Sequence, residues 1–131
     1  MIIPEWFNDI HFAFSRHNDG QMSFKRAEPD IVVKNRIKFF NGNNLNLDSV
    51  VASEIIHNKR IALVSQNDVG RGARERNWIP EIDGLVTSTV GLLLLTTHAD
   101  CAPIVIYPDF DTSLKIYTER VLFLRDLAFC I

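Results

Sequence analysis

The sequence predicts an α/β protein, because it contains both strand-like apolar runs and a well-delimited helix. Two short apolar runs, Gly91–Leu95 and Ala102–Tyr107, are rich in Leu, Ile and Val and are bounded by Gly, Thr and Pro. Such runs are typical of buried strands. A helix is predicted to start at Glu28-Pro29-Asp30, where Pro and acidic residues favour a first turn, and to end at Asn41-Gly42, where Gly favours a C-terminal cap.

The remaining elements are assigned from the same apolar patterns. Strands are expected near residues 10–15, 54–64, 84–87, 91–97 and 102–107, and a helix near 29–40. Within 54–64, the polar residues His57–Arg60 fit either one face of a continuous strand or the tip of a hairpin. Thr118–Ile131 fits either an amphipathic helix or a terminal buried element.

Composition and charge restrict the class of protein. The 131 residues, 47% hydrophobic and 23% charged, are expected to form one globular domain over 1–131. The net charge of −2 gives no basic footprint for nucleic acid, and no apolar run approaches the roughly 20 residues that cross a bilayer. Two cysteines without a repeated spacing do not suggest a disulfide framework, so a cytoplasmic location is expected.

Cys101 is the residue on which any chemistry is expected to converge. It lies in a polar break, His98-Ala99-Asp100-Cys101, between the two apolar strands. Three roles compete for it: a buried hydrophobe, a nucleophile held by a nearby His, or a metal ligand. On a straight strand, His98 and Cys101 would point to opposite faces, which makes the distant His57 the better partner for Cys101.

Two cationic positions are weaker candidates. Ser65–Ala73 is a Gly-rich loop in which Arg71 adds positive charge, but it lacks the Gly-Lys-Ser/Thr ending of a phosphate-binding Walker loop. A surface loop is therefore the favoured interpretation of this segment. Arg16 precedes a predicted turn of Asn, Asp and Gly, and its residue type alone favours a solvated loop.

Four motifs, taken in order, resemble those of the laccase-domain proteins, also called multicopper polyphenol oxidoreductases and now described as purine nucleoside phosphorylases. The motifs are Glu54-Ile55-Ile56-His57-Asn58, Asp68-Val69-Gly70-Arg71-Gly72-Ala73, Ile82-Asp83-Gly84-Leu85-Val86-Thr87, and Ala99-Asp100-Cys101-Ala102-Pro103-Ile104. Phe14-Ser15-Arg16 and Asn35-Arg36 also match typical positions of the family. The resemblance covers about residues 10–109.

The resemblance implies a cytosolic α/β fold with a mixed sheet and flanking helices, here an incomplete laccase-domain fold. It also implies one Zn²⁺ held by a Cys and two His, and phosphorolysis of adenosine, inosine and methylthioadenosine, with adenosine deamination as a further activity. Carried over, His57 and Cys101 would be metal ligands and catalytic residues. Arg16 and Arg71 would bind the substrate, and the partners would be a purine nucleoside and phosphate.

The sequence also departs from the family. Glu54 and Asn58 replace the Gln and Gly that flank the family's first His, and no His-Ala-Gly-Trp motif carrying the third ligand follows His98. Phe110–Ile131 does not resemble the family. A C-terminally truncated member with impaired activity is therefore expected, with an exposed half-core that favours self-association. The alternatives are an inactive fragment and copper-dependent oxidation of phenols, which the few available ligands disfavour.

Overall fold

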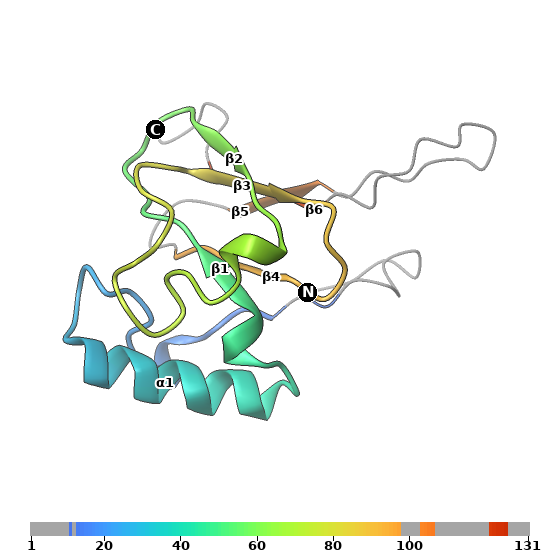
Figure 1. Ribbon diagram of the computed structural model, residues 1–131. Helices are drawn as coiled ribbons and strands as arrows, with labels where there is room; N and C mark the ends of the chain where they lie inside the picture. The colour runs from blue at the N-terminus through green and yellow to red at the C-terminus, as the bar shows by residue number, and fades with distance from the viewer. Residues whose placement is uncertain (1–10, 12, 98–102, 107–120, 126–131) are drawn as a thin grey trace.

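The computed structural model describes residues 11, 13–97, 103–106 and 121–125, and side chains throughout these ranges except in 103–106 and 121–125. Its regular elements are one α-helix and six strands, shown in Figure 1: α1 Pro29–Gly42, β1 Val50–Ala52, β2 Ile61–Leu63, β3 Gly84–Thr87, β4 Leu93–Leu95, β5 Pro103–Ile106 and β6 Val121–Arg125. Short 3-10 helices at His17–Asp19, Leu47–Ser49 and Gln66–Asp68 connect them.

The strands form two sheets. β1 pairs with β4 in a parallel two-stranded sheet, with Val50 opposite Leu93. The second sheet has the order β2-β3-β6-β5, in which β2 and β3 are parallel and both β3–β6 and β6–β5 are antiparallel. The α/β class and the mixed sheet predicted from the sequence are therefore confirmed. Figure 1 shows α1 on one side of the β1–β4 sheet and the four-stranded sheet on the other.

One apolar core lies between α1 and the two-stranded sheet. Its buried members are Phe40, Leu47, Val50, Ala52 and Ala73, with Leu93 and Leu95 packed against them. Because side chains alternate along a strand, Val50 and Ala52 leave the same face of β1 toward the helix. The helix thus packs on the sheet through apolar side chains, which recur at every second residue along β1 and with helical spacing along α1.

A second core lies on the opposite face of the two-stranded sheet. It contains Val51, Val64, Ile79, Leu85 and Leu92, with Ala62, Ile82 and Leu94 packed against it. Val51 and Leu94 are the alternate residues of β1 and β4, so these short strands are covered on both faces. This explains why they are almost entirely apolar.

Most predicted elements are present. The strands over 84–87 and 102–107 correspond to β3 and β5, and the strand over 91–97 is realised as the shorter β4. The helix over 29–40 extends to Gly42, and its left-handed exit residue is Asn44 (φ 56°), which corrects the capping role expected for Gly42. Thr118–Ile131 contains β6, so the helical alternative for this segment is wrong.

Two local predictions are wrong. No strand forms at the described positions 11 and 13–15, where Phe14 is 46% exposed. The expected strand over 54–64 is reduced to β2, and the hairpin alternative fails because residues 54–56 form no strand that could pair with β2. Ser65–Ala73 runs along the surface over 65–71, as expected, but its last residue, Ala73, is buried in the core beside α1.

Candidate functional site

His57 lies on an irregular turn between β1 and β2. Its backbone is left-handed (φ 64°), a conformation that non-glycine residues rarely adopt and that costs about 1–3 kcal/mol. The residue is exposed, and among the described residues its imidazole has no hydrogen-bond partner. The turn therefore exposes an imidazole that has no hydrogen-bond partner among the described residues, on a backbone of defined conformation.

The carboxylate of Asp83 holds this turn in place. Asp83 is 2% exposed, and its oxygens accept three consecutive backbone N–H groups: Ile56 N–H to Oδ2 at 3.2 Å, His57 N–H to Oδ1 at 2.8 Å and Asn58 N–H to Oδ2 at 2.9 Å. Successive N–H groups that point to one centre form an anion-binding concavity. Here the anion is supplied by the protein itself, immediately before β3.

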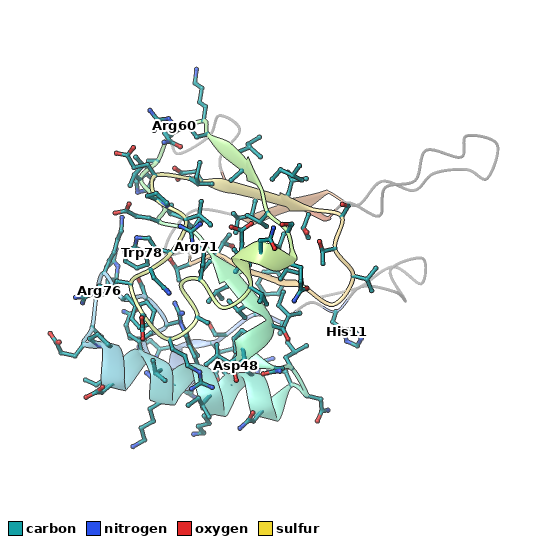
Figure 2. The ribbon with its side chains drawn as sticks, viewed as in Figure 1. His11, Asp48, Arg60, Arg71, Arg76 and Trp78 are labelled. Carbon is teal, nitrogen blue, oxygen red and sulfur yellow. The ribbon has the colours of Figure 1, made fainter. Side chains whose placement is uncertain are left out.

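Arg71 binds its own loop. Its Nε donates to the Asn77 carbonyl at 3.2 Å and its Nη2 to the Trp78 carbonyl at 3.2 Å, while Nη1 contacts Asp68 Oδ1 at 3.4 Å. Figure 2 shows Arg71 and Trp78 together on this loop, away from Arg60 at the start of β2. The Arg71 side chain remains 40% exposed, so part of it faces solvent.

Gly72 explains why this loop contains glycine. Its φ of 71° is left-handed, and an added Cβ would lie 2.8 Å from Ala52 Cβ and 2.9 Å from Trp78 Cβ. The Gly72 N–H is bound by the Asn77 side chain at 2.8 Å, so it is not open to a ligand. Close packing of the loop against β1 accounts for Gly72, without any role as a phosphate cradle.

Arg16 is the second cationic candidate and lies just before the 3-10 helix His17–Asp19. Its backbone N–H donates to Asp19 Oδ2 at 2.6 Å, which closes the turn and fixes where the residue sits. The side chain is exposed and has no ion pair or hydrogen bond among the described residues. Of the two cationic candidates, Arg16 has the guanidinium that is free to meet an anion.

Arg36 on α1 is a residue whose importance sequence reasoning missed. It is 2% exposed, and its guanidinium donates to the carbonyls of Met22 (3.0 and 2.8 Å), Gly72 (2.6 Å) and Ala73 (2.8 Å). Its Cζ lies 4.4 Å from the centroid of the Phe24 ring. Burial lowers the pKa of Arg36 to about 10, so it is still a cation at neutral pH. The Asn35-Arg36 pair matched the family, which was the available signal.

Two of the predicted positions, Cys101 and His98, lie outside the described residues. Within the described ranges, no group of three or more His, Cys, Asp or Glu side chains is placed to hold a metal ion. The predicted proximity of His57 and Cys101 therefore stays a prediction. The same ranges contain no helix that is both long and apolar enough to span a membrane.

The mixed α/β fold and the motifs that carry His57 and the Gly-rich loop are those that resemble the class of laccase-domain proteins. The family model described as "Multi-copper polyphenol oxidoreductase laccase" matches residues 13–114. The chain belongs to this family. The match covers the four motifs that carry the resemblance in the sequence.

Individual relatives agree with this assignment. The chain is 36% identical over 77 residues to purine nucleoside phosphorylase YlmD of Bacillus subtilis, and 36% identical over 74 residues to the protein of that name from Geobacillus stearothermophilus. The crystal structure of the latter YlmD matches with a TM-score of 0.69 and 28% identity, covering 79% of this chain. Bacillus licheniformis YfiH matches with a TM-score of 0.65 and 25% identity, covering 76%.

The matched region is a limited part of each relative. The alignments cover 58% and 56% of this chain but 28% and 27% of the two phosphorylases, and 37% and 35% of the solved YlmD and YfiH chains. The chain thus spans roughly a third of the length of the proteins that it matches. The similarity establishes the family and the fold of this part.

Proposed function

We propose that this chain contributes to a zinc-dependent purine nucleoside phosphorylase, which cleaves adenosine, inosine and methylthioadenosine with phosphate and also deaminates adenosine. The carrying observation is the His57 turn: an exposed imidazole on a left-handed backbone that a buried carboxylate fixes. The 36% identity to two proteins named purine nucleoside phosphorylase supports the reaction class.

In this proposal His57 and Cys101 hold the metal. The described donor fits the group, because the His57 imidazole makes no hydrogen bond among the described residues that would occupy its ring nitrogens, and imidazole with thiolate is a donor set that suits Zn²⁺. When bound, Zn²⁺ would supply a Lewis acid and activate a bound oxygen. The set of one Cys and few His is poor for a multicopper centre, although the family's description names copper.

The cationic residues are assigned to the anionic substrate. Arg16 would bind phosphate, since its guanidinium has no ion pair or hydrogen bond among the described residues and its backbone is tied to Asp19. Arg71 would contribute through the exposed part of its side chain, while its bonds to the Asn77 and Trp78 carbonyls hold it in one orientation. A planar guanidinium forms paired hydrogen bonds with phosphate oxygens, which orients the attacking oxygen.

The proposal is tested by metal content and by phosphorolysis. Zinc is measured by mass spectrometry in the wild type, His57→Ala, Cys101→Ala and His11→Ala, the last as a control that removes another exposed imidazole. Zinc at one equivalent in the wild type and His11→Ala, and its loss in the other two, is the expected result. Release of adenine or hypoxanthine with phosphate should follow the same order.

Three results would contradict the proposal. A wild-type protein without zinc after purification in zinc-containing buffer would remove the metal assignment. Zinc without phosphate-dependent release of any base would leave a metal-binding fragment that is catalytically inactive. Copper at one equivalent or more, with oxidation of a phenol, would favour the family's oxidoreductase label instead.

A further inference from the structure

Among the side chains that the structure describes, Asp83 has the only buried carboxylate. An ionised carboxylate removed from water is costly unless it receives hydrogen bonds. Asp83 receives them from three successive backbone N–H groups of the His57 turn, at 2.8–3.2 Å, and from no Lys or Arg within the described residues. Its hydrogen-bonding capacity is therefore directed to the 56–58 turn.

The two oxygens of Asp83 have different tasks. Oδ2 accepts from Ile56 and Asn58, on either side of His57, whereas Oδ1 accepts from His57 itself. An acceptor that binds the residue and both its neighbours fixes two peptide planes around the His57 Cα. The left-handed φ of 64° is a strained conformation that persists only where the surroundings determine it, and Asp83 is the group that does so.

The turn is also tied to the segment that carries Asp83. Asn58 Nδ2 donates to the Glu81 carbonyl at 2.9 Å, and the N–H groups of Asp83 and Gly84 both donate to the Arg60 carbonyl at 3.1 Å. Asp83 therefore cannot move away from the turn without breaking the pairing that starts β3. Its strand, which packs into the core through Leu85, transmits that rigidity to His57.

We propose that Asp83 is a positioning residue for His57: it sets the backbone from which the imidazole reaches the metal, without contacting the metal or substrate. This inference rests on the proposed function. Its consequence is that metal affinity depends on a buried carboxylate that is not a ligand. Outer groups that orient a ligand typically contribute 10–100-fold to metal affinity.

The test compares Asp83→Asn with Thr87→Val. Asn keeps the shape of Asp but has one acceptor oxygen, so it loses one or two of the three N–H bonds. Thr87→Val, at the end of the strand that follows Asp83, removes a hydroxyl that donates to the Val64 carbonyl at 2.8 Å and accepts from the Thr89 N–H at 3.1 Å. It does not touch the His57 turn. The probe is Zn²⁺ alone, titrated against a chromophoric chelator, and each variant's free energy of unfolding is measured in parallel.

Asp83→Asn should bind Zn²⁺ about tenfold more weakly than the wild type. Thr87→Val, with a comparable loss of stability, should bind it as the wild type does. Backbone amide exchange at 56–58 should be faster in Asp83→Asn only. Wild-type affinity in Asp83→Asn, or equal weakening in Thr87→Val, would overturn the positioning role. A wild type that binds no Zn²⁺ would overturn the proposed function, and the inference with it.

Discussion

Two buried charges organise this molecule, and each is solvated by backbone groups instead of by an opposite charge. Arg36 donates to the carbonyls of residues 22, 72 and 73, whereas Asp83 accepts from the N–H groups of residues 56–58. Each is 2% exposed. Neither forms an ion pair within the described part of the chain.

The difference lies in what each charge connects. Arg36 joins three separated parts of the chain: α1, the 22–24 segment and the Gly-rich loop. Asp83 binds three consecutive residues of one turn, which carries the candidate metal ligand. A cation between remote segments affects the stability of the whole fold, and an anion under one turn affects the geometry of one site. The comparison therefore predicts that Arg36 variants lose stability and that Asp83 variants chiefly lose function.

Replacing Arg36 by Met should have the largest effect on stability. Met fills much of the space but leaves the Met22, Gly72 and Ala73 carbonyls without their donor. Each buried acceptor left unpaired costs about 1–3 kcal/mol, so the free energy of unfolding should fall by about 3 kcal/mol or more. Urea denaturation of the full chain measures this.

Lys38→Met is the matched control for that experiment. It makes a similar change, from a basic side chain to Met, at an exposed position of the same helix, and should alter stability by no more than about 0.5 kcal/mol. If Arg36→Met differed from the wild type by no more than this control, the carbonyls would have found other partners. The role of Arg36 as a connector of remote segments would then be wrong.

Gly72→Ala sharpens the comparison from the acceptor side, since the Gly72 carbonyl is the nearest acceptor of Arg36, at 2.6 Å. The new Cβ would clash with the Ala52 and Trp78 Cβ atoms, and the φ of 71° is unfavourable for Ala. Together, the clash and the unfavourable backbone should lower the free energy of unfolding by about 2–4 kcal/mol. Thermal and urea unfolding both report this loss.

Gly70→Ala separates the two causes. Gly70 has a φ of 88°, but an added Cβ would meet no atom within 4 Å. Only the cost of placing Ala in a left-handed backbone remains, so the free energy of unfolding should fall by about 1–2 kcal/mol. Equal losses in the two variants would mean that the contact with β1 does not matter at Gly72, and that the loop does not hold its carbonyl in place for Arg36.

The sequence predicts the secondary structure correctly where the density of apolar residues alone determines it. β3 and β5 are dense in Val, Ile and Leu, and they form where the pattern predicts. The strand expected over 54–64 failed because His57 adopts a left-handed backbone that Asp83 stabilises from 26 positions away. No periodicity within 54–64 contains that information. The strand expected over 10–15 failed because a pattern cannot show whether a neighbouring strand exists.

The candidate site was predictable only by resemblance to a family. His57 stood out because it lies in a recognisable motif, since a single His in a mixed segment has no distinctive composition. Asp83 and Arg36 lay in matching motifs too, but their residue types predict exposure, and burial is a tertiary property. For Asp83, the one available signal was an Asp followed by Gly at the start of an apolar strand, and that pattern also fits an ordinary turn.

The ion pair between Asp48 and Arg74 provides the contrast with the two buried charges and should have the smallest effect. Arg74 Nε lies 2.7 Å from Asp48 Oδ1, and both side chains are largely exposed. The hydrogen bond from Arg74 lowers the pKa of Asp48 below its usual value. Any stability from this pair is therefore present above the unfolded-state pKa of Asp and is lost as the pH falls through the lowered folded-state pKa.

Asp48→Asn should remove that pH dependence and otherwise leave unfolding nearly unchanged, because exposed pairs are weakened by solvent and by salt. Urea midpoints of the wild type and Asp48→Asn, compared between pH 2.5 and 7 at low and high NaCl, measure the effect. The two curves should converge at acidic pH and also at high salt. A large, salt-independent loss in Asp48→Asn would show that an exposed charge stabilises this fold as strongly as a buried one, and would contradict the contrast between the two kinds of charge.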